Sequence, residues 1–206
     1  MPHNKVSRRR FLRTAALVLG VIGASLTTFF PVIAKWVPSR LRPPGALAED
    51  EFLASCIKCG QCVQVCPVQA ISLADINEGV GMGVPFIEAR AQACDFSCNA
   101  LQCILACPTG SLSHAVKKKE EVRMGLARVA NPGTCLATKG QGVYDLELCN
   151  LCEHKCPIDN AISLEPIGKT GNKMPVIHEA CVGCGVCEMI CPVEPAVIVI
   201  DERKVW

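Results

Sequence analysis

Cysteine is the residue type through which this chain of 206 residues can do chemistry, because its sixteen cysteines fall into four groups of four. The first and last groups have the spacing C-x2-C-x2-C-x3-C and are followed by proline, whereas the middle two keep only the closing C-x3-C-P. The groups are Cys56, Cys59, Cys62 and Cys66; Cys94, Cys98, Cys103 and Cys107; Cys135, Cys149, Cys152 and Cys156; and Cys181, Cys184, Cys187 and Cys191. Thiolates at the regular spacing bind the irons of a cubane [4Fe–4S] cluster.

The spacing predicts how each cluster is held. Three thiolates two residues apart lie on a tight loop that can wrap three irons of one cubane, while the fourth cysteine begins a helical stretch that reaches the cubane of a partner group. Proline then ends the motif and redirects the chain. Gly60, Gly183 and Gly185 let backbone amides approach the sulfides closely. The sequence therefore predicts four [4Fe–4S] clusters, with a three-iron or missing cluster at the second or third group as the alternative.

Other roles for these cysteines fit the pattern less well. Closely spaced thiols with proline after each group are a poor way to join distant segments by disulfides. Zinc sites use two C-x2-C pairs rather than a triplet with a distant fourth cysteine. Covalent haem needs C-x2-C-H, but Cys152 is followed by Glu153. Because nothing resembles a catalytic triad, a paired-carboxylate site, or a flavin or molybdopterin pocket, we predict an electron carrier rather than an enzyme.

Short strands and hairpins must position these groups. A β-prone stretch follows each C-P, at residues 70–73, 110–112, 161–164 and 196–200. Further β-prone stretches at 84–87 and 174–177 follow turn-rich segments, so two hairpins are expected. The predicted fold class is α+β, with two pseudo-symmetric bacterial-type 2[4Fe–4S] ferredoxin units of short hairpins, helices and many loops. Residues 117–130 are expected to link or pad the two units.

The formal charge of +2 is the sum of two unlike parts. Eight of the 21 basic residues lie before Glu49, which is the first acidic residue, whereas 13 basic and 19 acidic residues from Glu49 onward give a net charge of −6. The basic excess thus belongs to the start of the chain, and the rest is acidic. This balance argues against a nucleic-acid partner, which needs a strongly basic surface.

The basic start is typical of an export signal. Ser7–Arg13 matches the twin-arginine pattern Ser/Thr-Arg-Arg-x-Phe-Leu-Lys/Arg, and an uncharged run follows over Thr14–Ala34. Such signals export an already folded protein, which suits clusters inserted in the cytoplasm. Cleavage near Ala34 or Ala48 and retention as an anchor in the inner membrane are alternatives, and each places the rest of the chain in the periplasm.

A proline-rich stretch follows this leader. Residues 39–45 contain Pro43, Pro44 and two arginines, and they are expected to form an extended linker. The predicted domains are therefore 1–48, with the twin-arginine signal or membrane anchor and the linker, and 49–206, the four-cluster ferredoxin-type body.

Several of these segments together resemble one family. They are the twin-arginine leader, Leu41–Ala46 (LRPPGA), the first cysteine group, Arg123–Ala127 (RMGLA) and the last cysteine group. On these residues the chain resembles the periplasmic ferredoxin-type NapG/MauM proteins. The resemblance implies an electron-transfer protein that associates with the membrane and works with a membrane-bound quinol dehydrogenase carrying its own clusters. Electrons would pass toward a periplasmic acceptor, either a reductase such as nitrate reductase or a c-type cytochrome. In the MauM branch they would instead serve methylamine utilisation.

The resemblance also implies that the groups pair in a nested manner. The outer groups, 56–66 and 181–191, would pair, and so would the inner groups, 94–107 and 135–156. The implied ligand sets are Cys56, Cys59, Cys62 with Cys191; Cys94, Cys98, Cys103 with Cys156; Cys135, Cys149, Cys152 with Cys107; and Cys181, Cys184, Cys187 with Cys66. Spacing alone leaves adjacent pairing open, the first group with the second and the third with the fourth.

Two other functions use the same clusters. One is the electron-transfer subunit of a molybdopterin oxidoreductase complex, which predicts a stable complex with a molybdopterin subunit. The other is a redox sensor or assembly factor, which predicts clusters that do not turn over electrons when quinol and a terminal reductase are supplied.

Overall fold

The computed structural model of the chain divides into two units, which are described separately. It describes residues 8–34, 40–76, 81–98, 100–143, 148–168 and 171–202, with side chains described only up to residue 25 in the first range. One unit comprises Met1–Pro38 and Asp75–Met82. The other, which we call the body, comprises Ser39–Ala74 and Gly83–Trp206. All sixteen cysteines lie in described parts of the body.

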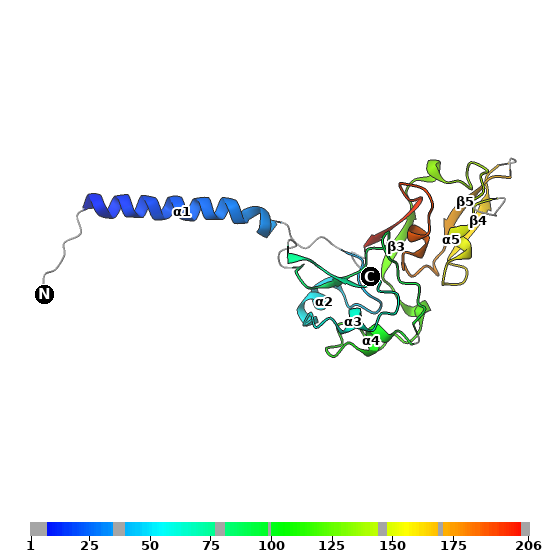
Figure 1. Ribbon diagram of the computed structural model, residues 1–206, viewed down its shortest axis with the longest axis horizontal. Helices are drawn as coiled ribbons and strands as arrows, with labels where there is room; N and C mark the ends of the chain where they lie inside the picture. Colours follow the sequence, from blue (N-terminus) through cyan, green and yellow to red (C-terminus); the bar gives the residue numbers. More distant parts are fainter. Residues whose placement is uncertain are drawn as a thin grey trace. The chain divides into compact units, whose positions relative to one another are not determined.

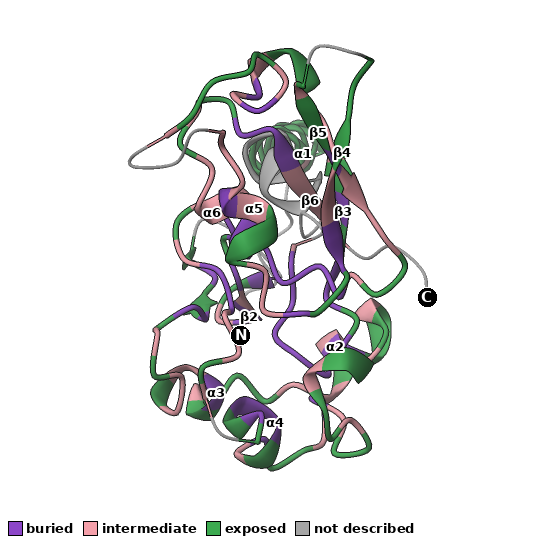
Figure 2. Ribbon diagram, turned by 90° about the vertical axis from the view of Figure 1, so that its right-hand side faces the viewer, coloured by how far each residue is buried: buried purple, intermediate pink, exposed green. Residues whose placement is uncertain are grey.

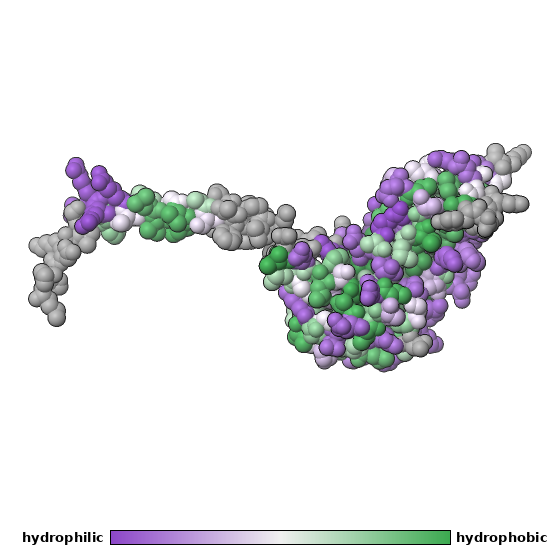
Figure 3. Space-filling view, viewed as in Figure 1, coloured by the Kyte–Doolittle hydropathy of each residue, from purple (hydrophilic) through white to green (hydrophobic). Residues whose placement is uncertain are grey.

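Helix α1 (Arg8–Ala34) carries the twin arginines and the uncharged run that follows them (Figure 1). Its described side chains pass from hydrophilic at the arginines to hydrophobic beyond them (Figure 3). Phe11 and Leu17 are 65% and 69% exposed. No helix in the described ranges combines the length and the apolar character that a bilayer crossing needs.

Four one-turn helices of the body each carry the third cysteine of a group. They are α3 (Gln61–Gln64), α4 (Gln102–Leu105), α5 (Leu151–His154) and α6 (Val186–Met189). The fourth cysteine was predicted to begin a helix, but Cys66 and its counterparts instead come just after one. The proline after each fourth cysteine explains this difference, because the helical conformation is unfavourable for a residue that precedes proline. Helix α3 lies beside α4 and α5 lies beside α6 (Figure 2).

Helix α2 (Glu49–Ser55) and two 3-10 turns, η2 (Lys119–Glu121) and η3 (Pro132–Thr134), lie elsewhere in the body. The first turn of α2 consists of three acidic residues, which favour a helix N-terminus because they face its partial positive charge. The helix buries Phe52 completely.

The strands of the described ranges pair into three two-stranded antiparallel sheets. Their bounds are β1 (Ser72–Leu73), β2 (Pro85–Phe86), β3 (Gly125–Val129), β4 (Ile162–Pro166), β5 (Lys173–Ile177) and β6 (Ile198–Glu202). The pairs β1–β2 and β4–β5 are the two predicted hairpins. The third pair joins β3 to β6. Strand β6 overlaps the β-prone stretch at 196–200, whereas β3 lies within residues 117–130. This segment was expected only to link or pad the units, and it instead supplies one strand of a sheet.

Two clusters of buried side chains fill the body. The larger contains Phe52 and Val122, both 0% exposed, with cysteines of the first, second and fourth groups. The smaller contains Ile198 with cysteines of the third and fourth groups. Cysteines thus occupy core positions in a chain with only 4% aromatic residues, which commonly dominate protein cores.

The proline-rich segment that was predicted to be a linker belongs to the body. Every residue from Leu41 to Ala46 is buried, and the Leu41 carbonyl accepts a hydrogen bond from the Ile87 amide at 2.8 Å. We call this segment, Leu41–Ala46, the strap. Proline suits a buried segment because its backbone nitrogen carries no hydrogen and so needs no hydrogen-bond acceptor. The body therefore begins at Ser39, ahead of the boundary predicted after residue 48.

Arg42 anchors this strap. Its Nε and Nη2 donate to the two carboxylate oxygens of Glu49 at 3.0 and 2.5 Å, and its Nη1 donates to the carbonyl of Pro85 at 3.0 Å. The guanidinium also lies 5.3 Å from the centre of the Phe52 ring. The Arg42 side chain is 6% exposed, so these contacts are shielded from water.

Replacing Arg42 by alanine is expected to lower the free energy of unfolding by about 2 kcal/mol, because it removes charge-assisted hydrogen bonds to the partly exposed Glu49 carboxylate and to the buried Pro85 carbonyl. Denaturant unfolding followed by far-UV circular dichroism measures the loss. Arg128→Ala is the matched control, since its ion pair with Asp201 is exposed and should change stability little. Equal losses in the two variants would contradict the anchoring role of Arg42.

Candidate cluster-binding sites

The first cysteine triplet faces a cavity together with the last cysteine of the second group. This cavity, site A, is lined by Cys56, Cys59, Cys62 and Cys107. Phe52, Pro85 and Leu112 contribute to its wall. Arg42 therefore braces site A, because it contacts both Phe52 and Pro85.

Two similar cavities occur in the part of the body that contains the third and fourth groups. Site C is lined by Cys156, Cys181, Cys184 and Cys187. Site D is lined by Cys135, Cys149, Cys152 and Cys191. Apolar side chains such as Leu164 and Val197 surround the thiols of site D, and Cys187 borders its cavity as well as that of site C. Each site thus takes three thiols from one group and one from its neighbour.

We assign the remaining four cysteines to site B, namely Cys66, Cys94, Cys98 and Cys103. Burial, as the largest cause, and the neighbouring charges of Cys98, Cys62 and Cys66 together raise the pKa of Cys103 to about 12. Cys94 is likewise close to Cys103 and Cys98, whose charges add to the effect of burial in raising its pKa. Site B therefore follows the same rule, with Cys66 as the single cysteine from the neighbouring group.

The pairing of groups is adjacent, which corrects the nested sets implied by the family resemblance. The structure places Cys107 rather than Cys191 with the first triplet, and Cys191 rather than Cys107 with the third. Cys156 rather than Cys66 lies with the fourth triplet, and Cys66 rather than Cys156 lies near Cys103 of the second. The reason is the packing of α3 beside α4 and of α5 beside α6, because a cysteine that follows one helix meets the triplet at the other.

Burial raises the pKa of several thiols. Burial is the largest cause, and together with nearby cysteines it raises the pKa of Cys62 to about 11 and those of Cys152 and Cys184 to about 12. Such thiols keep their protons at neutral pH and lose them when they bind iron, because the metal favours the thiolate. In the described ranges, no three Cys, His, Asp or Glu side chains converge closely enough to hold one metal ion. Four thiols around an apolar cavity fit a [4Fe–4S] cubane, which takes four thiolates.

Cys107 differs from the buried thiols because hydroxyl groups surround it. Its Sγ lies 3.2 Å from the Ser111 hydroxyl and 3.8 Å from that of Thr109, and it accepts a hydrogen bond from the Leu112 amide at 3.5 Å. Burial acts to raise the pKa of Cys107, but these hydrogen bonds outweigh it and lower the pKa to about 7. The sequence analysis missed Ser111 and Thr109, although Cys-Pro-Thr-Gly-Ser after the second group carries the signal.

Replacing Ser111 by alanine is expected to lower the reduction potential of site A by up to about 40 mV, taking about 1 kcal/mol for the hydrogen bond and 59 mV per tenfold change in a one-electron equilibrium. Hydrogen bonds to a ligating sulfur favour the reduced state because it carries more negative charge. A redox titration followed by electron paramagnetic resonance (EPR) measures the shift. Ser113→Ala is the control, since that hydroxyl instead accepts from the Ala115 amide. An equal shift in both variants would contradict the assignment of Ser111 to site A.

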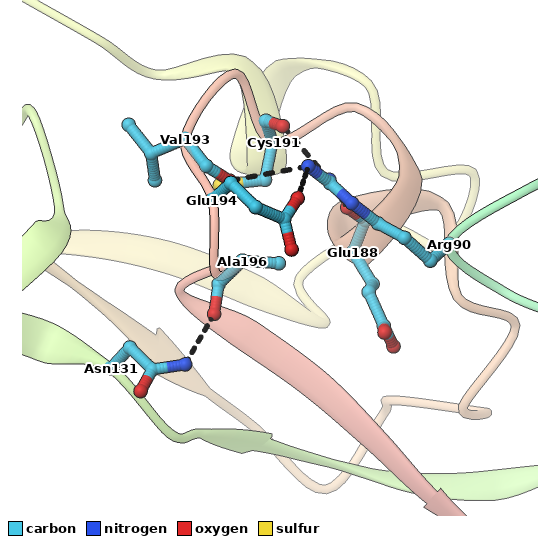
Figure 4. Close-up of polar contacts among 7 residues, drawn as sticks. All are labelled: Arg90, Asn131, Glu188, Cys191, Val193, Glu194 and Ala196. Atoms are coloured by element: carbon cyan, nitrogen blue, oxygen red, sulfur yellow. Dashed lines mark hydrogen bonds and ion pairs between the residues drawn. The ribbon is translucent and has the colours of Figure 1, made fainter.

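Arg90 holds the loop that carries Cys191 (Figure 4). Its Nη1 donates to the carbonyls of Glu188 and Cys191 at 2.6 and 2.9 Å, and its Nη2 donates to the carbonyl of Val193 at 3.2 Å. Nη2 also contacts the exposed carboxylate of Glu194 at 2.8 Å. The sequence contains no signal for this role, because the acceptors are backbone carbonyls about a hundred residues further along the chain.

The chain is similar to known iron–sulfur proteins over nearly its whole length. A family model described as a 4Fe-4S dicluster domain matches residues 55–111 and 147–194, and each match spans cysteines of two neighbouring groups. The methylamine utilization ferredoxin-type proteins MauM of Methylorubrum extorquens and Paracoccus denitrificans are 38% and 39% identical over 96% and 97% of this chain, and 90% and 89% of their own lengths.

The ferredoxin-type protein NapG of Escherichia coli is 37% identical over 94% of this chain and 85% of its own length. No solved structure matches the chain. The α+β fold with two dicluster units agrees with the sequence prediction. On the family model and these relatives, the chain belongs to the family of NapG and MauM ferredoxin-type electron-transfer proteins.

Proposed function

We propose that this iron–sulfur protein holds four [4Fe–4S] clusters, one at each of sites A to D, and relays electrons from a membrane-bound quinol dehydrogenase toward a periplasmic reductase such as nitrate reductase. The observation that carries the proposal is the grouping of all sixteen cysteines into four sets, each with three thiols from one group and one from its neighbour. Bound clusters supply reversible one-electron storage. The chain itself supplies the thiolates, the apolar walls and the hydrogen bonds to sulfur that adjust the potentials.

Anaerobically purified protein tests the cofactor part of this proposal. We expect about four irons for each set of four cysteines and several one-electron signals in a redox titration. Colourless, iron-free protein would overturn it. The relay is tested separately by adding membranes that contain the quinol dehydrogenase together with quinol. Clusters that stay oxidised would exclude the relay while leaving the protein an iron–sulfur carrier.

A role in methylamine utilisation is the second candidate, because relatives named for that process match this chain as well as the relative named NapG does. Deleting the gene distinguishes the two. Loss of quinol-dependent periplasmic nitrate reduction supports the first candidate, whereas loss of growth on methylamine with intact nitrate reduction supports the second.

We also propose that the protein is exported in the folded state by the twin-arginine route and works in the periplasm. A variant with Arg8→Lys and Arg9→Lys is expected to leave nearly all of the protein in the cytoplasm, because the pattern requires both arginines. Cell fractionation and immunoblotting measure the distribution. Arg13→Lys is the control, since the pattern accepts lysine there, and equal export of both variants would contradict the proposed route.

A further inference from the structure

The triplet loops of the first and fourth groups have the same spacing but opposite exposure. In the first, Ile57 is 63% exposed and Cys59 is also exposed. In the fourth, the equivalent Val182 and Cys184 are 1% and 7% exposed. Because the sequence spacing is identical, the difference comes from what covers the loops in the fold. The loop of site A is open to solvent, whereas the loop of site C packs inside the body.

Gly185, which precedes α6, packs against the segment that leads into the second cysteine group. A Cβ at Gly185 would lie 2.5 Å from the Cβ of Ala89 and 3.5 Å from that of Ala93. The two backbones therefore approach as closely as glycine allows. Gly60 holds the equivalent position before α3, and there, among the described residues, the atom nearest to such a Cβ is a Leu73 methyl at 3.9 Å.

Polar contacts hold the same two segments together. The Ala93 amide donates to the Met189 sulfur at 3.2 Å, and Arg90 donates to the Glu188 carbonyl at 2.6 Å. We call the two segments, Ala89–Cys94 and Cys184–Met189, the seam. The first segment ends in a thiol of site B and the second begins with a thiol of site C.

The thiols at the seam are neighbours. Cys94 directly follows Ala93, and Cys184 directly precedes Gly185, which packs against Ala89 and Ala93. Cys94 and Cys184 also belong to one cluster of buried side chains. Sites B and C therefore face each other across the seam.

Within each half of the body, the two sites are neighbours as well. Helix α3, which carries Cys62 of site A, packs beside α4, which carries Cys103 of site B, and both thiols lie in one cluster of buried side chains. Cys187 of site C borders the cavity of site D. The first half thus joins A to B, and the second joins C to D.

We infer that the chain arranges its sites in one linear order, A–B–C–D, and that the seam is where an electron crosses between the two dicluster halves. The inference rests on the proposed function, since it requires clusters at the sites. The exchange moves one electron, so that one site is oxidised as its neighbour is reduced, and no bond is made or broken. Sites A and D are the ends of the order, at which the quinol-oxidising partner and the electron acceptor must deliver and remove electrons.

Two double variants test this order. Cys59→Ala with Cys149→Ala disables the end sites A and D and leaves B and C, whereas Cys98→Ala with Cys181→Ala disables B and C and leaves A and D. In the reduced proteins, EPR is expected to reveal two interacting spins in the first variant and two isolated spins in the second. Isolated spins in the first, or interacting spins in the second, would overturn the order. A parent protein without iron would instead refute the proposed function.

A pair of glycine variants tests the seam. Gly60→Ala and Gly185→Ala both place a side chain at positive φ before a one-turn helix, with φ of 74° and 92°, but only the second adds a methyl group to the seam. With iron content retained, Gly185→Ala is expected to weaken the spin interaction between sites B and C and leave the interactions A–B and C–D unchanged. Identical spectra for the two variants would contradict the inference. If Gly185→Ala loses iron or does not fold, the cysteine double variants decide, because they keep the seam intact.

Discussion

Replacement of Cys107 by alanine is expected to disable site A and leave the other three clusters, with a loss of up to about a quarter of the iron. The reason is that the Cys107 thiol faces the same cavity as the first triplet. Iron analysis and EPR of the reduced protein measure the loss. Nested pairing of the groups predicts a loss at site D instead, so the affected site distinguishes the two arrangements.

Double variants identify that site. Cys107→Ala combined with Cys59→Ala is expected to affect no more clusters than either single change, because both thiols belong to site A. Cys107→Ala combined with Cys149→Ala is expected to affect two clusters, because Cys149 belongs to site D. Residues that act on one site are non-additive, whereas independent sites add. The reverse pattern would contradict adjacent pairing.

The sequence predicts which residues bind clusters better than it predicts which cysteine groups pair. Spacing identifies the cysteine groups, and turn-rich segments between β-prone stretches identify the hairpins β1–β2 and β4–β5, because both are local features. Which cysteine triplet Cys107 or Cys191 joins is not a local feature of the sequence. It depends on which one-turn helices pack together, and four helices with nearly the same cysteine pattern offer no local signal for that choice.

The strap from Leu41 to Ala46 illustrates a second limit. Two prolines next to an arginine are typical of an exposed linker, but here the prolines are buried and Arg42 pairs with Glu49. The same holds for β3, whose partner β6 lies about seventy residues further along the chain. Composition predicts the conformation that a segment favours by itself. The strap and β3 instead take their conformations from contacts with segments that are distant in the sequence.

Replacement of Arg90 by alanine is expected to make site D lose iron about 10–100-fold faster, the usual cost of removing a group that supports a metal ligand. The guanidinium donates to three successive acceptors around Cys191, namely the carbonyls of Glu188, Cys191 and Val193. Without it, the loop that carries the Cys191 thiol loses three hydrogen bonds that join it to the first half of the body. The rate of iron transfer to a chelator under anaerobic conditions, with EPR to identify the site, measures the effect.

Two further variants separate the carbonyl contacts of Arg90 from its ion pair. The Glu194 side chain is 77% exposed, so Glu194→Ala removes only a screened contact and is expected to leave iron retention close to that of the parent protein. Arg90→Lys keeps the charge but cannot place donors at three carbonyls at once, because an ammonium is a point donor and a guanidinium is a planar fork. Its rate of iron loss should therefore fall between the other two. If Glu194→Ala matched Arg90→Ala, charge pairing rather than the fixing of the Cys191 loop would be the role of Arg90, and site D would depend on the net charge around it.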